Sequence, residues 1–210
     1  MDGNVEKNIL INAIEQKDYN EIIAIIRETV DINAPNYNGK TILKLLVENI
    51  IDNEEIYNLL YEKEAFYGEN IIKRFKCLEK NIGLMKSFAK YGFYYFNPCN
   101  NSSTSVYINK PVLFFTKRGD NYIGVIKNLL DNNACIEEYD ENTGFTPIFQ
   151  AIKYRSYKTF ILLINDYHPD ITKRNKRNEN ILMFANKYKK RIKNEMIQCI
   201  TNIKKRIKEI

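Results

Sequence analysis

Residues 141–152, ENTGFTPIFQAI, decide the fold of this chain. Gly144 stands two residues before the pair Thr146-Pro147, where an apolar run with helical spacing begins. Glycine supplies a positive φ at a turn, threonine can cap the helix that follows, and proline suits the first helical turn, where its missing N–H is not needed. This stretch therefore predicts a turn that leads directly into a short helix.

The same opening recurs along the chain. Its polar residue is, in order, Asn8, Thr41, Lys110, Thr146 and Asn180, at separations of 33, 69, 36 and 34 residues. The 69-residue gap is about twice the others, which indicates a further and less regular copy near residues 70–97. A fixed period of this length is typical of an array of small helical repeats.

A second apolar stretch follows the first one in each copy, after a polar break. These second stretches are residues 21–26, 55–60, 84–90, 125–130 and 160–164. Their apolar side chains recur at helical spacing, as Ile22, Ile25 and Ile26 do, so each stretch predicts an amphipathic helix. One helix pair cannot bury its own apolar face, so neighbouring pairs are expected to stack.

The opening motif resembles that of the ankyrin repeat, Thr-Pro-Leu-His-x-Ala, whose period is about 33 residues. Residues 146–151 keep five of its six positions in kind, and residues 31–43, DINAPNYNGKTIL, resemble the hairpin between two such repeats. The resemblance implies an all-α ankyrin-repeat solenoid of about six stacked helix-turn-helix units, with hairpin-like loops and a basic C-terminal capping helix. The units would form a single domain over residues 1–210, with approximate bounds 5–37, 38–69, 70–106, 107–142, 143–176 and 177–210.

The resemblance also implies a function, because ankyrin repeats contact partner proteins through their hairpin tips and the concave face of their first helices. The matching tip residues here are Tyr37, Asn38, Lys40, Glu141, Asn142, Phe145, Lys176, Arg177 and Glu179. The first-helix ends add Glu48, Asn49, Lys153, Tyr154, Lys187 and Tyr188. Tyr37, Phe145, Tyr154 and Tyr188 are the preferred anchors, because aromatic residues dominate interface energetics, although each could instead pack against a neighbouring repeat. The hairpin that leads into the fifth unit, here called the fifth hairpin, carries one extra residue, Thr143.

Basic residues are concentrated at the C-terminal end. Residues 173–210 hold 13 Lys and Arg against 3 Glu, in a chain whose net charge is +6. Apolar residues recur there every three or four positions, which predicts one amphipathic helix; they are Ile192, Met196, Ile200, Ile203, Ile207 and Ile210. Such a helix can be the polar-faced cap of a repeat array, or it can bind nucleic acid, an anionic membrane or an acidic partner.

Four aromatic residues follow Gly92 in the stretch YGFYYF, residues 91–96. They can pack beneath the following loop, or they can form an exposed recognition patch. The polar stretch NPCNNSSTS, residues 97–105, follows at once as an insertion relative to the other repeats. Insertions in repeat arrays often lie on the binding face, and a plain disordered bulge is the alternative.

Signatures of catalysis and of metal binding are missing from the sequence. The single histidine, His168, lies in a predicted turn, and no CxxC, HExxH or glycine-rich phosphate loop occurs. Cys77, Cys99, Cys135 and Cys199 lie far apart, which favours buried small residues in a reducing compartment over disulfides or metal ligands. We therefore expect a cytoplasmic, monomeric, non-enzymatic protein without cofactor or metal, whose partner is another protein and which acts in its own cell or in a host cell.

Overall fold

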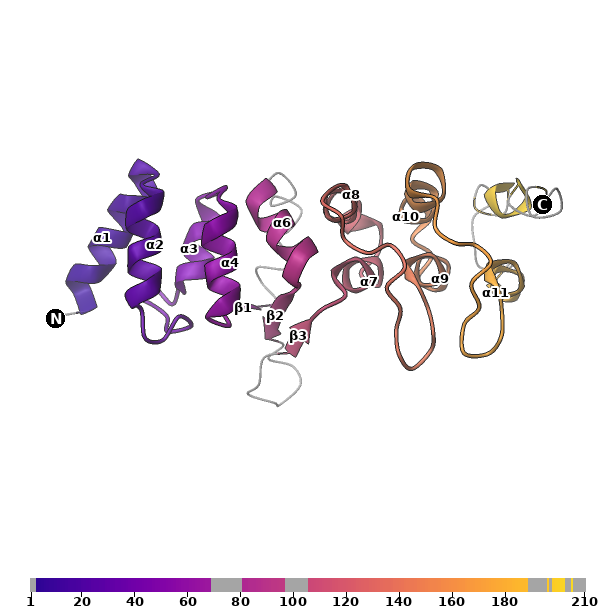
Figure 1. Cartoon of the computed structure of the whole chain (residues 1–210), viewed down its shortest axis with the longest axis horizontal. Helices are drawn as coiled ribbons and strands as arrows, with labels where there is room; N and C mark the ends of the chain where they lie inside the picture. Colours follow the sequence, from indigo (N-terminus) through magenta and orange to yellow (C-terminus); the bar gives the residue numbers. More distant parts are fainter. Residues whose placement is uncertain are drawn as a thin grey trace. The chain divides into compact units, whose positions relative to one another are not determined.

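The computed structural model describes residues 3–68, 81–96, 106–188, 196, 198–202 and 205. The chain divides into two compact units, an N-terminal unit of residues 1–109 and a C-terminal unit of residues 110–210, where the sequence predicted one domain. Both units consist mainly of short helices, as predicted, and most of these helices come in consecutive pairs (Figure 1).

Five helices are described in the N-terminal unit. They are α1 (Gly3–Gln16), α2 (Tyr19–Glu28), α3 (Ile42–Glu48), α4 (Glu54–Glu62) and α6 (Ile82–Tyr91). Helix α1 packs on α2, α2 on α4, and α4 on α6. Their apolar faces are almost fully buried, at residues Ile22, Ile26, Leu43, Leu46, Ile56, Leu60, Leu84 and Phe88. The second helices predicted at residues 21–26, 55–60 and 84–90 are confirmed.

Three short strands complete the N-terminal unit, and the sequence did not predict them. Strand β1 (Phe66–Gly68) runs parallel to β2 (Phe93–Phe96), and β2 runs antiparallel to β3 (Val106–Ile108). The chain is mainly helical, in keeping with the expected all-α class, and this small sheet is a local addition to it. The helix pair expected over residues 70–106 is tested only in part. Within that range the structure describes one helix, α6, and strands β2 and β3, while residues 69–80 and the polar insertion at 97–105 lie outside the described residues.

Tyr91 and Phe93, at the start of the aromatic stretch, pack against other aromatic rings and do not form an exposed patch. Phe93 is 1% exposed and stacks on Phe88, with ring centroids 4.6 Å apart. Tyr91 stacks on Tyr61 with centroids 4.9 Å apart. Gly92 joins α6 to β2 with φ +78°, and a Cβ there would stand 2.0 Å from the carbonyl oxygen of Ile108. Only glycine fits between this helix and the sheet.

Five helices of the C-terminal unit are described with their bounds. They are α7 (Pro111–Thr116), α8 (Ile123–Asp131), α9 (Pro147–Lys153), α10 (Tyr157–Leu162) and α11 (Ile181–Tyr188). A short 3-10 helix, η2 (Asp120–Tyr122), precedes α8, and a π-helical turn, η3 (Leu163–Tyr167), extends α10. Helix α9 packs against both α7 and α11, and α10 packs against α8, so equivalent helices lie side by side (Figure 1).

An aromatic cluster joins α9 to α11 inside the C-terminal unit. Phe184 lies 4.8 Å from Phe145 and 5.3 Å from Phe149, measured between ring centroids, in both cases edge to face. The ring of Tyr188 lies 4.9 Å from that of Phe184 and is tilted by 40° to it. Edge-to-face pairs add about 0.5–1.5 kcal/mol to the gain from burial, so this cluster stabilises the contact between the two helices.

Backbone geometry repeats with the predicted period. A positive φ occurs nine residues after four of the five motif residues, at Lys17 (54°), Ile50 (52°), Gly119 (89°) and Arg155 (58°). A residue with positive φ ends a helix and redirects the chain toward the next one. Because three of these four residues are not glycine, the path between the two helices of a pair, and not glycine's freedom, imposes this conformation.

Helix starts agree with the motif in most respects. Thr41 Oγ1 and Asn180 Oδ1 each accept a hydrogen bond from the N–H three residues later, at 3.2 and 2.9 Å. Pro147 occupies the first turn of α9, as predicted. Thr146 lies at the N-cap position, but its side chain is 4% exposed and makes no capping hydrogen bond, so the predicted cap is corrected there.

The C-terminal end is helical at the positions that the structure describes. Met196 is 1% exposed and Ile200 is 9% exposed, which confirms that these two residues share a buried face. Lys205 is exposed, and the other four predicted apolar positions, Ile192, Ile203, Ile207 and Ile210, lie outside the described residues. No helix in the described part of the chain is long and apolar enough to cross a membrane.

Candidate partner-binding surface

Three hairpin loops share one pattern of backbone hydrogen bonds. The bonds that close them run from Asn36 N to Lys40 O (2.8 Å), from Asp140 N to Phe145 O (3.0 Å) and from Asn175 N to Glu179 O (3.0 Å). The loop closed by Asp140 and Phe145 is one residue longer than the others, which confirms the extra residue predicted there. The three loops are therefore equivalent elements of a repeat.

Each hairpin is also held from inside by the side chain of its first residue. Oδ1 of that residue accepts two backbone N–H groups of the tip, at 3.0 and 2.9 Å for Asn36 and at 2.9 and 3.0 Å for Asn175. Asp140 does the same for Asn142 and Thr143 at 3.1 Å each. The predicted positive φ is confirmed in all three loops, at Gly39 (68°), Gly144 (71°) and Asn178 (60°). These bonds fix the backbone of each tip.

Six of the predicted contact residues lie at the tips with exposed side chains. They are Tyr37, Asn38, Glu141, Asn142, Lys176 and Arg177. Tyr37 is 69% exposed, which is unusual for a large aromatic side chain. In the C-terminal unit, Lys176 N donates to Thr143 O at 3.0 Å, so the two tips of that unit lie side by side.

The residue that closes each hairpin contacts the end of the following helix, eight residues later. Lys40 Nζ lies 2.7 Å from Glu48 Oε2. Glu179 forms an ion pair with Lys187. In the fifth hairpin the closing residue is Phe145, and Lys153 Nζ lies 5.3 Å from its ring centroid. An aromatic ring thus takes the place of the charged closing residue. These contacts join each hairpin to its first helix.

Two predicted tip residues are buried rather than exposed. Phe145 is 6% exposed and packs in the aromatic cluster, and Glu179 is 7% exposed. Their placement at the tip is corrected, because at the closing position the chain turns back toward the helix and the side chain folds beneath the loop. Lys40 occupies the same position and is half-buried.

Ends of the first helices carry the remaining predicted contact residues. Lys153 and Lys187 are exposed, and Tyr154 is 44% exposed. Asn49 is exposed as well, although its amide donates to Leu45 O at 2.8 Å. Tyr188 is half-buried against Phe184, so this anchor contributes to packing as well as to the surface.

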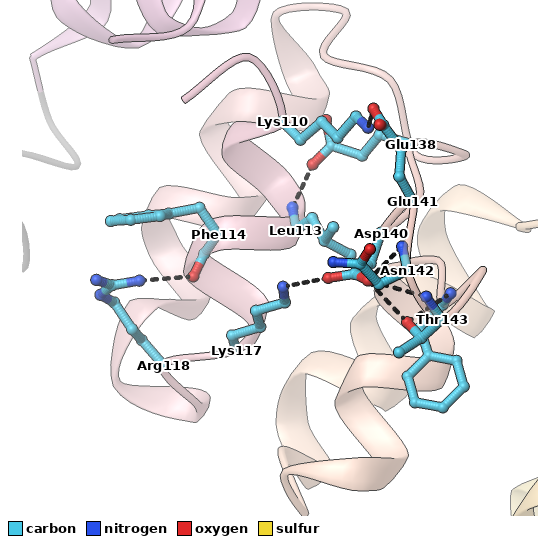
Figure 2. A network of polar contacts seen from close by, with 11 residues as sticks. Lys110, Leu113, Phe114, Lys117, Arg118, Glu138, Asp140, Glu141, Asn142 and Thr143 are labelled. Atoms are coloured by element: carbon cyan, nitrogen blue, oxygen red, sulfur yellow. Dashed lines mark hydrogen bonds and ion pairs between the residues drawn. The ribbon is translucent and has the colours of Figure 1, made fainter. Parts of the chain in front are cut away.

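A polar network ties the fifth hairpin to α7 (Figure 2). Lys117 Nζ lies 2.8 Å from Asp140 Oδ2, and Lys110 Nζ lies 2.8 Å from Glu141 Oε1. The hydrogen bond from Lys117 is the main reason why the pKa of Asp140 falls to about 2. Asp140 thus remains a carboxylate at any physiological pH, and it orders both the tip of its own hairpin and the end of α7.

Glu138 caps α7 from outside that helix. Lys110, the residue before α7, makes no side-chain cap, and Glu138 instead accepts a hydrogen bond from the N–H of Leu113. The Glu138 side chain is almost fully buried, and this burial raises its pKa to about 8, although the Leu113 N–H and the nearby Lys110 lower it. The carboxyl group is therefore largely protonated at neutral pH.

Aspartates cap two further helices across repeats. Asp120 accepts from the N–H groups of Lys158 (3.0 Å) and Thr159 (2.9 Å) at the start of α10, where Ser156 makes no side-chain cap. Asp52 accepts from Gly83 N at 2.6 Å at the start of α6. Sequence reasoning missed these residues and Glu138. At α7 and α10 the available signal was a helix start without a local side-chain cap, whereas α6 has its own cap in Asn81. The partners found in the structure lie 25 to 39 residues away.

The single histidine and two of the four cysteines lie within the described residues. His168 lies in a turn with φ 49°, and its Nδ1 lies 2.9 Å from Ile164 O, which confirms the predicted turn residue. Cys135 is exposed and Cys199 half-buried, and both are free thiols, so the prediction of buried cysteines is wrong for Cys135. Cys77 and Cys99 lie outside the described residues. Among the residues that the structure does describe, no three metal-ligating side chains gather into a site.

Neither a family model nor a curated protein matches this chain. Among the described residues, the exposed tips and helix ends carry aromatic, amide and charged side chains on hydrogen-bonded backbone.

Proposed function

We propose that this chain is an ankyrin-type repeat protein that binds another protein through its hairpin tips and the ends of its first helices. The observation that supports this function best is the hydrogen-bonding of the three equivalent hairpins, which orders each tip while its side chains remain in solvent. Binding by an ordered loop avoids much of the entropy cost of immobilising it. Rigid backbone with exposed side chains is what a scaffold needs.

A binding role is favoured over catalysis by the way in which the polar groups are used. Glu138 and Asp120 cap helices, and Asp140 holds a hairpin together. The perturbed pKa of Glu138 has a structural cause, because its carboxyl is buried at a helix start. Perturbed carboxyls can mark active sites, but these side chains are occupied by the fold itself.

The basic C-terminal segment is proposed as a cap of the C-terminal unit. Burial of Met196 and Ile200 favours this role, because a segment that binds nucleic acid or membrane needs no buried apolar face within its own fold. Binding of nucleic acid or anionic lipid by the lysines of this segment is the competing function.

Photo-crosslinking in a lysate of the source cell tests the proposal. A photoreactive phenylalanine analogue would replace Tyr37, Asn142 or Arg177 in the full-length chain, and Lys158 on α10 would be the matched exposed control. We expect one protein to crosslink from Asn142 and Arg177, whose tips lie side by side, and not from Lys158, at both low and near-physiological salt; Tyr37, in the other unit, is scored separately. Equal crosslinking from all four positions would contradict a specific surface.

A second variant distinguishes protein binding from the competing function, the binding of nucleic acid or anionic lipid by the basic segment. Replacing Lys204, Lys205, Arg206 and Lys208 with glutamine removes four charges while Met196 and Ile200 stay in place. We expect the crosslinked protein to remain. Recovery of nucleic acid or lipid alone, lost both at higher salt and in this variant, would transfer the function to the basic segment.

A further inference from the structure

Three lysines occupy equivalent positions at the ends of the first helices of the C-terminal unit. Lys117, Lys153 and Lys187 each lie seven residues after the polar residue of their motif. Helix α9, which carries Lys153, packs against both α7 and α11. Packed helices lie about 8–10 Å apart, so the three lysines form a column with one lysine per helix.

Among the described residues, the outer two lysines of this column have carboxylate partners and the middle one has none. Lys117 Nζ lies 2.8 Å from Asp140, and Lys187 is paired with Glu179. Across the described part of the chain, no carboxylate forms an ion pair with Lys153, whose side chain is exposed. The column therefore presents a single unneutralised ammonium group between two neutralised ones.

The closing residues of the hairpins explain why Lys153 has no carboxylate partner among the described residues. Lys40 pairs with Glu48, and Glu179 pairs with Lys187, in each case from the closing residue of the hairpin to the helix end. In the fifth hairpin the closing residue is Phe145, so its contact with Lys153 brings a ring and no negative charge. Among the residues that the structure describes, Lys153 thus has no carboxylate in the position where Lys187 has Glu179.

Two aromatic rings flank the lysine. The Nζ atom of Lys153 lies 5.3 Å from the ring centroid of Phe145 and 5.4 Å from that of Tyr154. Ring faces attract a cation but leave its hydrogen-bond donors available. Tyr154 is 44% exposed, so it offers an apolar surface next to the ammonium group.

We propose that Lys153 binds the carboxylate of an aspartate or glutamate in a peptide segment of the partner protein, with an apolar residue of that segment against Tyr154. This inference rests on the proposed scaffold function and names the chemistry of the partner. A carboxylate would complete the kind of ion pair that Glu179 makes with Lys187.

A nucleic acid fits this site less well. Phosphates are spaced regularly and need several cations to bind, because affinity grows with the number of phosphates neutralised. Here Lys117 and Lys187 are already neutralised, so a polyanion on this column would meet Asp140 and Glu179 as well as one free ammonium. An isolated acidic residue in an otherwise uncharged segment avoids that repulsion.

Selection of peptides tests the proposal. Random 12-residue peptides displayed on phage would be selected on the immobilised full-length chain, and enriched peptides would be measured by fluorescence anisotropy. We expect an Asp or Glu beside an apolar residue, and a Kd about two- to fivefold weaker for Lys153→Gln, the range for an ion pair at an exposed site. Lys158→Gln removes an exposed charge from the same unit and should leave the Kd unchanged.

Two further measurements make the result specific. Lys153→Arg should restore binding, and replacing the peptide's acidic residue by its amide should cost as much as Lys153→Gln, with no further loss when both changes are combined. Melting followed by circular dichroism controls for folding of each variant.

Failure of this inference can be told apart from failure of the proposed function. Enriched peptides that lack acidic residues, or that bind the Lys153→Gln variant as tightly as the natural chain, would overturn the inference while leaving a peptide-binding scaffold. Loss of binding to a 12-nucleotide single-stranded DNA in Lys153→Gln would overturn it in favour of phosphate. If no peptide is enriched, both proposals are wrong.

Discussion

Replacing Glu138 with glutamine is expected to remove a pH dependence from the stability of the C-terminal unit. Burial raises the pKa of the Glu138 carboxyl from its ordinary 4.5 to about 8, and the Leu113 N–H and Lys110 oppose that rise only in part. Glutamine has nearly the same shape and can accept the Leu113 N–H through its carbonyl oxygen, but it cannot ionise. The substitution therefore removes the titration and keeps the cap.

The direction and size of the effect follow from the two pKa values. The unfolded chain loses this proton near pH 4.5, and the folded chain keeps it until about pH 8. The stabilisation is thus complete below pH 4.5 and is lost as the pH rises through 8. About 1.4 kcal/mol for each of about 3.5 pH units gives on the order of 5 kcal/mol. This is an upper limit, because any opening of the hairpin that admits water reduces it.

Urea unfolding followed by circular dichroism, at pH values from 5 to 9, measures the effect. We expect Glu138→Gln to become progressively more stable than the natural chain as the pH rises, with most of the change between pH 5 and 8. Glu141→Gln, in the same hairpin but exposed, is the control and should show no such trend. Hydrogen exchange of the Leu113 amide reports the same event locally.

Two outcomes would refute this reasoning. A constant difference between the natural chain and Glu138→Gln from pH 5 to 9 would mean that the pKa of Glu138 is not raised. A glutamine variant that is less stable at high pH would mean that Glu138 caps α7 as a carboxylate, with the N–H donors and Lys110 outweighing the cost of burial.

Three further predictions concern the packing. Gly92→Ala should cost more than about 2 kcal/mol, whereas Gly39→Ala, which has a similar φ but nothing within 4 Å, should cost about 1 kcal/mol; equal shifts in urea midpoint would contradict the clash with the sheet. Asp120→Ala should cost about 1–2 kcal/mol and accelerate amide exchange at Thr159, and unchanged exchange would disprove the cap on α10. Phe184→Ala should cost about 3–5 kcal/mol in urea unfolding, and a loss below about 1 kcal/mol would show that the aromatic cluster does not hold α11.

Much of the local structure could be predicted because its causes lie within a few residues. Gly39, Gly144 and Asn178 were expected to take a positive φ, and all three do. The second helices followed from apolar residues at helical spacing, and their buried faces agree with that pattern at Ile22 and Ile26. The hairpins and helix pairs are therefore readable from short-range spacing alone.

The sheet could not be predicted in the same way. Its strands are only three or four residues long, and β1 pairs with β2 across 28 residues of chain, as Phe66 and Tyr94 do. Such short strands carry no periodicity that a sequence can display. Pairing partners that lie far apart in the chain determine where these strands form. The need for glycine at position 92 likewise depends on the carbonyl oxygen of Ile108, which belongs to another strand.

The sequence by itself determined where the repeats begin and which residues turn the chain, because these properties depend on neighbours within about four positions. Only the tertiary structure decided which polar residues remain available. Packing buries Phe145 and Glu179 and brings the Glu138 carboxyl to the N–H of Leu113 in α7. Among the described residues, it gives Lys187 a carboxylate partner and gives Lys153 none. A side chain's partner can lie a whole repeat away, so its free charge exists only after neighbouring repeats have packed.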